Sequence, residues 1–313
     1  MIIKDYREQL MREDGGGLSH FIIWMHAIRP KTLPAAAAPV IVGTALAYRD
    51  GAFQFGPAIA ALCAALLLQI GANLANDVFD YRKGADTKER LGPVRMTQAG
   101  LLTPEHVLKG MWVSFGIAAM CGVYLTFVAG WIIILIGVLS ISAAAAYTGG
   151  PYPLGYYGLG DLFVFIFFGL VAVCGTYYVQ VGGINSSVIW ASIPMGFLIT
   201  AILVVNNLRD IYTDREAGKK TLAVRLGVTG TRLEYSFCIF GAYVIPLCMW
   251  IVGMESAWIS LVLLSSPLAL SLVRKIWHES GRDLNPALAR TGQQVLLYSV
   301  LFSAGVILPY FIR

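Results

Sequence analysis

The amino-acid sequence predicts an all-α polytopic membrane protein, a bundle of nine transmembrane helices. Hydrophobic residues make up 57% of the 313 residues and charged residues only 13%, against about 25% charged residues in soluble domains. The mean hydropathy is +0.69. Apolar runs of about 20 residues, each long enough to cross about 30 Å of hydrocarbon, recur along the whole chain. A β-barrel would instead show an alternation of apolar and polar residues with a period of two.

Clusters of Gly and Pro separate the apolar runs and delimit the predicted spans. These spans cover residues 31–48, 57–80, 106–128, 131–148, 159–180, 188–208, 233–253, 256–275 and 293–312. Residues 1–20 are polar and of mixed charge, show no cleavable signal peptide, and are expected to form a cytoplasmic arm. The five cysteines lie in apolar spans without metal-ligand spacing, so we expect them to be small core residues.

The distribution of basic residues predicts the orientation of the chain in the cell inner membrane. Apart from Arg49 and Arg313, every Lys and Arg lies before or at the start of the first span, or in the regions 81–109, 209–232 and 274–292. Basic residues concentrate on the cytoplasmic side of a membrane. We therefore expect the N-terminus and these regions to be cytoplasmic and the C-terminus, after an odd number of spans, to lie outside.

Two acidic motifs lie at predicted cytoplasmic ends of spans, NLANDVFDYRKGAD at residues 73–86 and NNLRDIYTDREAGKK at residues 206–220. At a fixed offset of 130 residues, N-D-x-x-D in the first motif corresponds to N-N-x-x-D in the second. We interpret this as a duplicated four-helix unit within a single membrane-embedded domain that covers residues 1–313. Such a pseudo-repeat would set the two acidic helix ends face to face around a central cavity.

The acidic and amide side chains of each motif are spaced to share one helix face, because residues at i, i+3, i+4 and i+7 lie on one side of a helix. The first stripe consists of Asn73, Asn76, Asp77 and Asp80, and the second of Asn206, Asp210 and Asp214. Mg²⁺ typically binds one or two carboxylates together with substrate phosphates. Arg95, Lys219 and Lys220 lie nearby in the sequence and could hold phosphate oxygens. The pattern indicates a metal-bridged polyphosphate site.

The two motifs resemble the paired aspartate motifs of the UbiA superfamily of intramembrane prenyltransferases, and the resemblance extends from residue 29 to the last span. It implies the nine-helix fold of that family. RPKTLPA at 29–35, KGAD followed by GPVRMTQAG, and AYTGGPYPLGYYGLGD at 146–161 resemble the menaquinone-pathway branch, which acts on 1,4-dihydroxy-2-naphthoate. The pattern departs from the commonest family form, because Gly84 stands in place of the third acid and Asp86 follows two residues later.

The resemblance implies Mg²⁺-dependent transfer of a polyprenyl group from polyprenyl diphosphate to 1,4-dihydroxy-2-naphthoate, with loss of CO₂ and pyrophosphate, giving demethylmenaquinone. The metal ligands that it implies are Asp77, Asp80, Asp210 and Asp214. The substrate-binding residues that it implies are Asn73, Asn76, Asp86, Arg95, Asn206, Lys219 and Lys220. Arg29 and Lys31 are candidates for orienting the anionic acceptor, and Tyr147 is a candidate for stabilising an allylic cation.

The sequence alone leaves other functions open. A secondary transporter also has intramembrane acids and an internal repeat, but its acids lie near the bilayer midplane, whereas these lie at one face beside basic loops. The same chemistry on 4-hydroxybenzoate, homogentisate or a porphyrin, and a non-catalytic scaffold, are further alternatives. The basic loops lack nucleic-acid-binding signatures, so the expected partners are the lipid bilayer and the two substrates. Neither the oligomeric state nor the isoprenoid length is predicted.

Overall fold

The computed structural model describes residues 20–84 and 91–312, and every regular element in these ranges is helical. In chain order the elements are α2 (His20–Ile28), η1 (Pro30–Thr32), α3 (Leu33–Arg49), α4 (Phe55–Arg82), α5 (Pro104–Ala129), α6 (Ile132–Ala146), η2 (Leu154–Tyr157), α7 (Gly160–Val164), η3 (Phe165–Val171), α8 (Ala172–Val181), α9 (Ser186–Arg209), α10 (Ile211–Glu216), α11 (Leu222–Ile251), η4 (Ala257–Ser265), α12 (Ser266–His278), η5 (Gly281–Asp283) and α13 (Leu284–Phe311). The predicted all-α class is confirmed.

Seven helical segments of the described residues are long and apolar enough to cross a membrane. They are Phe55–Arg82, Pro104–Ala129, Gly160–Val181, Ser186–Arg209, Leu222–Ile251, Ala257–His278 and Gly281–Phe311. Helices α3 and α6 occupy the positions of two further predicted spans but have only 17 and 15 residues. The chain is therefore a multi-pass helical membrane protein, while the number of nine membrane crossings stays a prediction.

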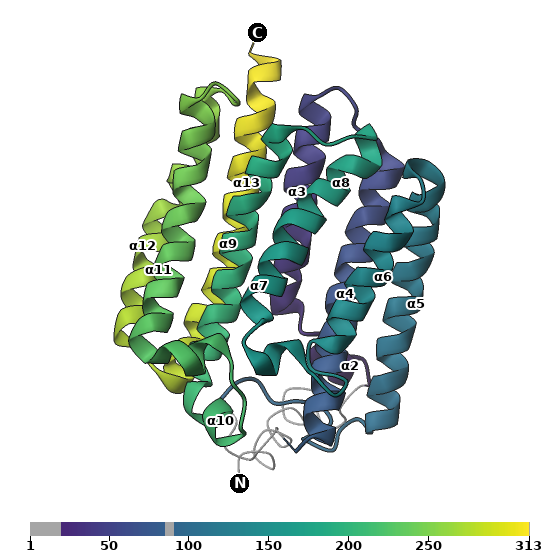
Figure 1. Ribbon diagram of the computed structural model, residues 1–313, viewed down its shortest axis with the longest axis vertical. Helices are drawn as coiled ribbons and strands as arrows, with labels where there is room; N and C mark the ends of the chain where they lie inside the picture. The colour runs from purple at the N-terminus through teal and green to yellow at the C-terminus, as the bar shows by residue number, and fades with distance from the viewer. Residues whose placement is uncertain (1–19, 85–90, 313) are drawn as a thin grey trace.

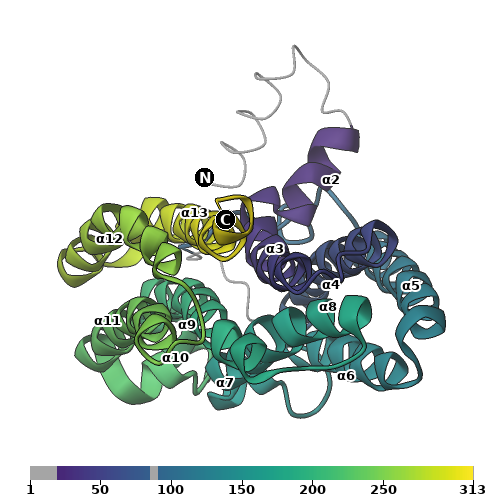
Figure 2. The same cartoon turned by 90° about the horizontal axis from the view of Figure 1, so that it is seen from above.

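The long helices run side by side along one axis (Figure 1) and, seen from above, surround a central region (Figure 2). Helix α3 packs against α13 and α8, α4 packs against α5, and α9 packs against α11 and η3. Helices α4 and α9 both terminate at the end of the bundle where α2 and α10 lie, and α13 terminates at the other end (Figure 1). We call these the acidic end and the opposite end.

A π-helical turn lies at the centre of the bundle beside the interior cavity. Residues Phe165–Val171 form a π-helical turn between α7 and α8. Gly169 in this turn meets Gly196 of α9 so closely that a Cβ added to Gly169 would lie 2.6 Å from the Gly196 Cα. Small residues at such contacts let helix backbones approach in membrane proteins. Phe167 and Phe168 of this turn both line the interior cavity.

The opposite end is held together by a polar cluster around Arg49. Its guanidinium contacts Asp50 at 2.7 Å and pairs with Glu255 in the α11–η4 loop. Asp50 also accepts a hydrogen bond of 2.5 Å from the Tyr177 hydroxyl of α8. Burial works to raise the pKa of Asp50, but the hydrogen bonds from Arg49 and Tyr177 outweigh it, so this pKa lies below its ordinary value. For Glu255 burial dominates and raises the pKa.

Candidate active site

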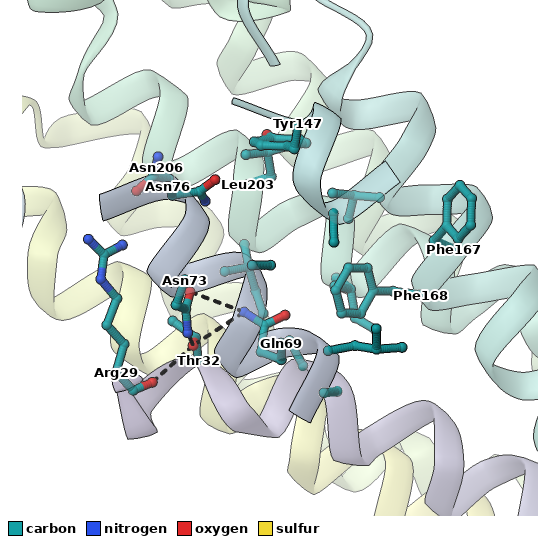
Figure 3. Close-up of a pocket in the computed structure, with 18 of the residues that line it drawn as sticks. Arg29, Thr32, Gln69, Asn73, Asn76, Tyr147, Phe167, Phe168, Leu203 and Asn206 are labelled. Atoms are coloured by element: carbon teal, nitrogen blue, oxygen red, sulfur yellow. Dashed lines mark hydrogen bonds between the residues drawn. The ribbon is translucent and has the colours of Figure 1, made fainter. Parts of the chain in front are cut away.

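A cavity of about 900 Å³ lies between α3, α4, α6, α9 and the α7–η3–α8 segment. This volume is near the upper end of the range for small-molecule sites, about 300–1,000 Å³. Its lining is polar at the acidic end, where both motifs contribute side chains, and largely apolar over the rest of its length. Figure 3 shows part of the lining, with amide side chains on one side and Phe167 and Phe168 on the other.

The first motif reaches the cavity from the last three turns of α4. Asn73, Asn76 and Asp80 all line the cavity, as their spacing on one helix face predicts. Asn73 donates hydrogen bonds of 2.9 Å to the Ile28 carbonyl and to the Thr32 hydroxyl, so this side chain also fixes the corner before α3. The Asn76 side-chain oxygen accepts a hydrogen bond of 2.9 Å from Thr148.

Asp77 is the member of the first stripe that does not line the cavity. Its carboxylate accepts a hydrogen bond of 3.1 Å from the backbone N–H of Met96, one of 3.4 Å from the backbone N–H of Thr97, and one from the Thr97 hydroxyl. The side chain is buried, with 2% of its surface exposed. In this arrangement Asp77 positions the loop that carries Arg95, and direct metal ligation by Asp77 stays a prediction.

Asp80 is the buried charge at the centre of the acidic end. The Arg95 guanidinium lies 2.5 Å from one carboxylate oxygen, and the Tyr156 hydroxyl donates a hydrogen bond of 2.5 Å to the other. Arg95 also donates to the Asn76 carbonyl. Removing two charges from water costs several kcal/mol for each ion. The site therefore holds its own cation against its own acid, so that an anionic ligand could pair with Arg95 and a bound cation with Asp80.

The second motif reaches the cavity where α9 ends. Arg209, which is 1% exposed, donates two hydrogen bonds to Asp210, of 2.8 and 2.5 Å, and one of 2.8 Å to the Asn206 side chain. It also donates to Asn285 of α13 at 3.0 Å. Asn206, Arg209 and Asp210 all line the cavity. Arg209 thus holds the second motif as Arg95 holds the first.

Asp214 of α10 completes the acidic lining and is paired with Lys219 at 3.1 Å. Burial is the largest cause that raises the pKa of Asp214, and the nearby charges of Asp210 and Asp80 raise it further, while Lys219 works in the opposite direction. Asp80 of the first motif and Asp214 of the second both line the acidic end of this single cavity.

The segment between α6 and α7 closes over this end and is held by basic side chains. The ammonium groups of Lys83 and Lys219 lie 5.0 and 4.8 Å from the centre of the Tyr156 ring. The backbone N–H of Lys220 donates to the Tyr156 carbonyl at 2.7 Å, and the Arg225 side chain donates to the Tyr157 carbonyl at 2.7 Å. Burial is the largest cause that lowers the pKa of Lys83, and Lys219 lowers it further.

Tyr147, at the end of α6, lines the same cavity (Figure 3). A Cβ at Gly160 would lie 2.8 Å from its hydroxyl oxygen, and a Cβ at Gly155 would lie 3.0 Å from its ring. The two glycines of the GLG and PLG stretches therefore leave room for the Tyr147 ring.

Arg29 marks a strained corner between α2 and α3. It has a positive φ of 57°, a left-handed conformation that costs a non-glycine residue about 1–3 kcal/mol and often occurs at functional sites. Its carbonyl accepts a hydrogen bond of 2.9 Å from the Thr32 hydroxyl, which Gln69 and Asn73 also contact. The Arg29 side chain extends beside Asn73 toward Asn76 and Asn206 (Figure 3).

The structure brings most of the predicted site residues to one cavity. The predicted residues that line it are Arg29, Lys31, Asn73, Asn76, Asp80, Arg95, Tyr147, Asn206, Asp210, Asp214 and Lys219. Lys31 is exposed at this lining. Lys220 is exposed outside it and contributes its backbone N–H. Asp86 lies outside the described residues.

Arg209 and Gln69 line the cavity but are absent from the sequence prediction. Arg209 was counted only as a basic residue of the cytoplasmic face, although it stands beside Asp210 in the sequence. Gln69 extends the first stripe by one turn, since it precedes Asn73 by four residues and donates to its side chain at 3.4 Å. That spacing was a signal in the sequence.

The donor set of the acidic end fits a hard divalent cation that is shared with a phosphate ligand. Among the described residues, no three His, Cys, Asp or Glu side chains are close enough to hold a metal by themselves. Mg²⁺ typically takes one or two carboxylates and completes its shell with water and substrate phosphates. Asp80, Asp210 and Asp214, with the amide oxygens of Asn76 and Asn206, supply ligands of this kind.

Fold and site together define a class of protein. It is a helical membrane protein with an apolar chamber, and two acidic motifs with paired basic residues line one end of that chamber. Such a site suits a lipid with an anionic head group. The chain belongs to the UbiA prenyltransferase family, whose pattern matches residues 36–302.

Named relatives and solved structures agree with this membership. The chain is 39% identical to the 1,4-dihydroxy-2-naphthoate octaprenyltransferase of Escherichia coli, over 91% of this chain and 95% of the relative. It is 38% identical to the enzyme of the same name from Mycobacterium tuberculosis, over 90% and 96% of the two chains. A UbiA homologue from Archaeoglobus fulgidus bound to GPP and Mg²⁺ has the same fold, with a TM-score of 0.66 and 13% identity over 91% of this chain and 99% of that one.

Proposed function

We propose that the protein transfers a polyprenyl group from a polyprenyl diphosphate to 1,4-dihydroxy-2-naphthoate and releases CO₂ and pyrophosphate, giving demethylmenaquinone in its quinol form. One observation carries this proposal: both acidic motifs, their cations and an apolar chamber meet in one cavity. The names of the relatives support the choice of acceptor.

The diphosphate head of the donor would bind at the acidic end. Asp80, Asp210 and Asp214 would hold Mg²⁺, which when bound neutralises the diphosphate and stabilises charge on the leaving group. Arg95, Arg209 and Lys219 are now paired with these same carboxylates. With the carboxylates holding the metal, Arg95, Arg209 and Lys219 would be available to the phosphate oxygens.

The acceptor would bind between Arg29 and the amide side chains of α4. The carboxylate of 1,4-dihydroxy-2-naphthoate suits a guanidinium, and its hydroxyl groups suit Gln69 and Asn73. All three side chains line the cavity beside the acidic end. This position places the acceptor ring between the diphosphate and the apolar chamber, where the first carbon of the prenyl chain must lie.

The reaction then requires no oxidant or reductant. The bond between the first prenyl carbon and the diphosphate oxygen breaks, and its electron pair leaves with pyrophosphate. The ring carbon that bears the carboxylate attacks the allylic cation. Loss of CO₂ returns the electron pair of the broken carbon–carbon bond to the ring and restores its aromaticity. The Tyr147 ring lines the cavity where it can stabilise the cation through its π face.

We further infer that the acidic end faces the cytoplasm, because basic residues concentrate there and cytoplasmic segments are rich in Lys and Arg. Cysteine labels in 91–103 and 215–221 are expected to react from the cytoplasmic side, and a reporter fused after residue 313 is expected to lie outside. If the two segments reacted with label from opposite sides of the membrane, the result would contradict a shared site.

A panel of acceptors tests the proposed reaction. Purified protein in lipid vesicles receives Mg²⁺, one polyprenyl diphosphate, and either 1,4-dihydroxy-2-naphthoate labelled with ¹³C at the carboxyl carbon or 4-hydroxybenzoate. We expect a prenylated naphthalenediol and labelled CO₂ from the first acceptor. Prenylation of 4-hydroxybenzoate alone would show that the acceptor is wrong, and uptake of either compound without a new product would favour a transporter.

A further inference from the structure

The cavity continues far beyond the residues that hold the diphosphate and the acceptor. Ala61 lines it and lies 19 residues before Asp80 in α4, which corresponds to about 28 Å at 1.5 Å per residue. Leu125 of α5 and Val179 of α8 line the cavity at similar depth. Each lies near the C-terminus of its helix, toward the opposite end of the bundle. The cavity therefore runs through most of the roughly 30 Å of hydrocarbon that a bilayer provides.

An apolar cluster closes the deep end of this chamber. Val40, Ala61, Leu125, Ile133 and Val179 are buried against one another, and all five line the cavity. They come from α3, α4, α5, α6 and α8, so five helices converge there. We call these five residues the floor. A chamber with such walls and such a floor fits a hydrocarbon chain whose diphosphate head lies at the acidic end.

Gly175 of α8 lines the chamber close to the floor. Helix α8 is aligned with α4 by a hydrogen bond of 3.2 Å from the Gln54 N–H to the Gln180 side chain. Counting forward along α4 and back along α8 from that contact places Gly175 within about one turn of the depth of Ala61.

No helix contact among the described residues requires glycine at position 175. A Cβ added there would meet no atom within 4 Å. Gly43 of α3 is different, because a Cβ there would lie 2.9 Å from the Thr176 Cβ, so packing fixes it as glycine. The missing side chain at position 175 thus leaves space inside the chamber and serves no packing purpose between helices.

We propose that Gly175 determines how long a prenyl chain the enzyme accepts, an inference that rests on the proposed prenyl transfer. An isoprene unit adds four carbon–carbon bonds of about 1.5 Å, or about 5 Å in extended form. About six units therefore reach from Asp80 to the depth of Gly175. A chain of eight units, about 40 Å long in extended form, is long enough to reach Gly175, whereas a chain of two units, about 10 Å long, is too short.

The discrimination at this position is steric. A donor that arrives from the bilayer leaves lipid tails that are as apolar as the chamber, so its tail gains little hydrophobic free energy on entry. A side chain at position 175 would occupy space that a long tail needs, so the long tail would lose van der Waals contacts with the chamber wall. A short tail would not reach that side chain.

The test substitutes Gly175→Ala, Gly175→Leu and Gly175→Phe and compares kcat/KM for geranyl diphosphate with kcat/KM for octaprenyl diphosphate. We expect the ratio of the short to the long donor to rise with side-chain size, by at least about tenfold in the Phe variant, equivalent to about 1.4 kcal/mol. Gly116→Phe is the matched control, because Gly116 of α5 is also open to an added Cβ but is exposed outside the chamber. It is expected to keep the native ratio.

A binding measurement without acceptor separates this inference from the proposed reaction. The rise in melting temperature caused by each diphosphate with Mg²⁺ is measured for the same variants. Octaprenyl diphosphate is expected to stabilise Gly175→Phe much less than the native protein, while geranyl diphosphate stabilises both. Equal stabilisation by both donors in a folded Gly175→Phe variant would overturn the role of Gly175. Discrimination in binding without any prenylated naphthalenediol would overturn the proposed reaction and leave this inference standing.

Discussion

The backbone N–H of Met96 donates a hydrogen bond of 3.1 Å to the Asp77 carboxylate, and this contact ties the first acidic motif to the loop that carries Arg95. Thr97 contacts the same carboxylate through its N–H and its hydroxyl. The same loop then brings Arg95 to Asp80. One aspartate of the motif thus positions the cation that neutralises the next.

Replacement of Asp77 is expected to destabilise the protein. Asp77→Ala should lower the free energy of unfolding by about 1–3 kcal/mol, because the buried N–H groups of Met96 and Thr97 lose their acceptor. Asp77→Asn should cost less, since one side-chain oxygen remains. Thermal unfolding in detergent measures the effect, with Glu216→Ala at an exposed position as control. An unchanged melting temperature in Asp77→Ala would contradict the positioning role.

The buried pair of Asp80 and Arg95 is expected to show strong coupling. Arg95→Met leaves a buried carboxylate without its cation, which typically costs about 3–5 kcal/mol. The double variant Asp80→Asn with Arg95→Met should lose less than the two single variants together, because it leaves no unpaired charge. A double-mutant cycle on the free energy of unfolding measures the coupling. Additive effects would show that the two side chains do not act as a pair.

Tyr156 is expected to matter more through its ring than through its hydroxyl. Tyr156→Phe keeps the face that meets Lys83 and Lys219 and loses the hydrogen bond to Asp80. Tyr156→Leu loses both. Each cation–π contact is worth about 0.5–1 kcal/mol, so the Leu variant should show roughly a tenfold higher KM for the diphosphate than the Phe variant. Equal KM values in the two variants would assign the effect to the hydroxyl alone.

The polar cluster at the opposite end predicts a pH dependence of stability. The pKa of Asp50 in the folded protein lies below the ordinary 3.8, so its stabilising contribution is present above pH 3.8 and is lost as the pH falls through the lowered pKa. In metal-free protein, Asp50→Asn should reduce the fall of melting temperature below about pH 4. Glu216→Gln, at an exposed position, should leave that fall unchanged. Parallel melting curves for native protein and Asp50→Asn would contradict this.

The sequence predicted the class of fold and the polar lining for physical reasons that act locally. Apolar runs must be helical in a bilayer, and residues at i, i+3 and i+7 of α4 must share a face. Asn73, Asn76 and Asp80 therefore reached the cavity as expected. The predicted spans 31–48 and 131–148 also match α3 and α6, and differ from these helices by one or two residues at each end.

The orientation of the Asp77 side chain could not be predicted from residue spacing. Its place at i+4 belongs to the predicted face, but a tertiary contact with the loop after residue 91 turns its carboxylate toward Met96 and Thr97. Arg209 was missed for a related reason. Charge counting explained it as a topology signal, whereas its burial between Asp210 and Asn285 depends on the approach of α13 to α9.

Turnover of two matched variants tests most directly whether both motifs act on one donor. Asp80→Asn and Asp210→Asn are compared with the native protein at saturating polyprenyl diphosphate and Mg²⁺, with 1,4-dihydroxy-2-naphthoate as acceptor. Each change removes one anionic ligand at similar size, so kcat should fall by roughly a hundredfold or more in both variants, as when one stabilising contact to a transition state is lost. Near-native kcat in either variant, in a protein that unfolds at the native temperature, would contradict a site shared by the two acidic motifs.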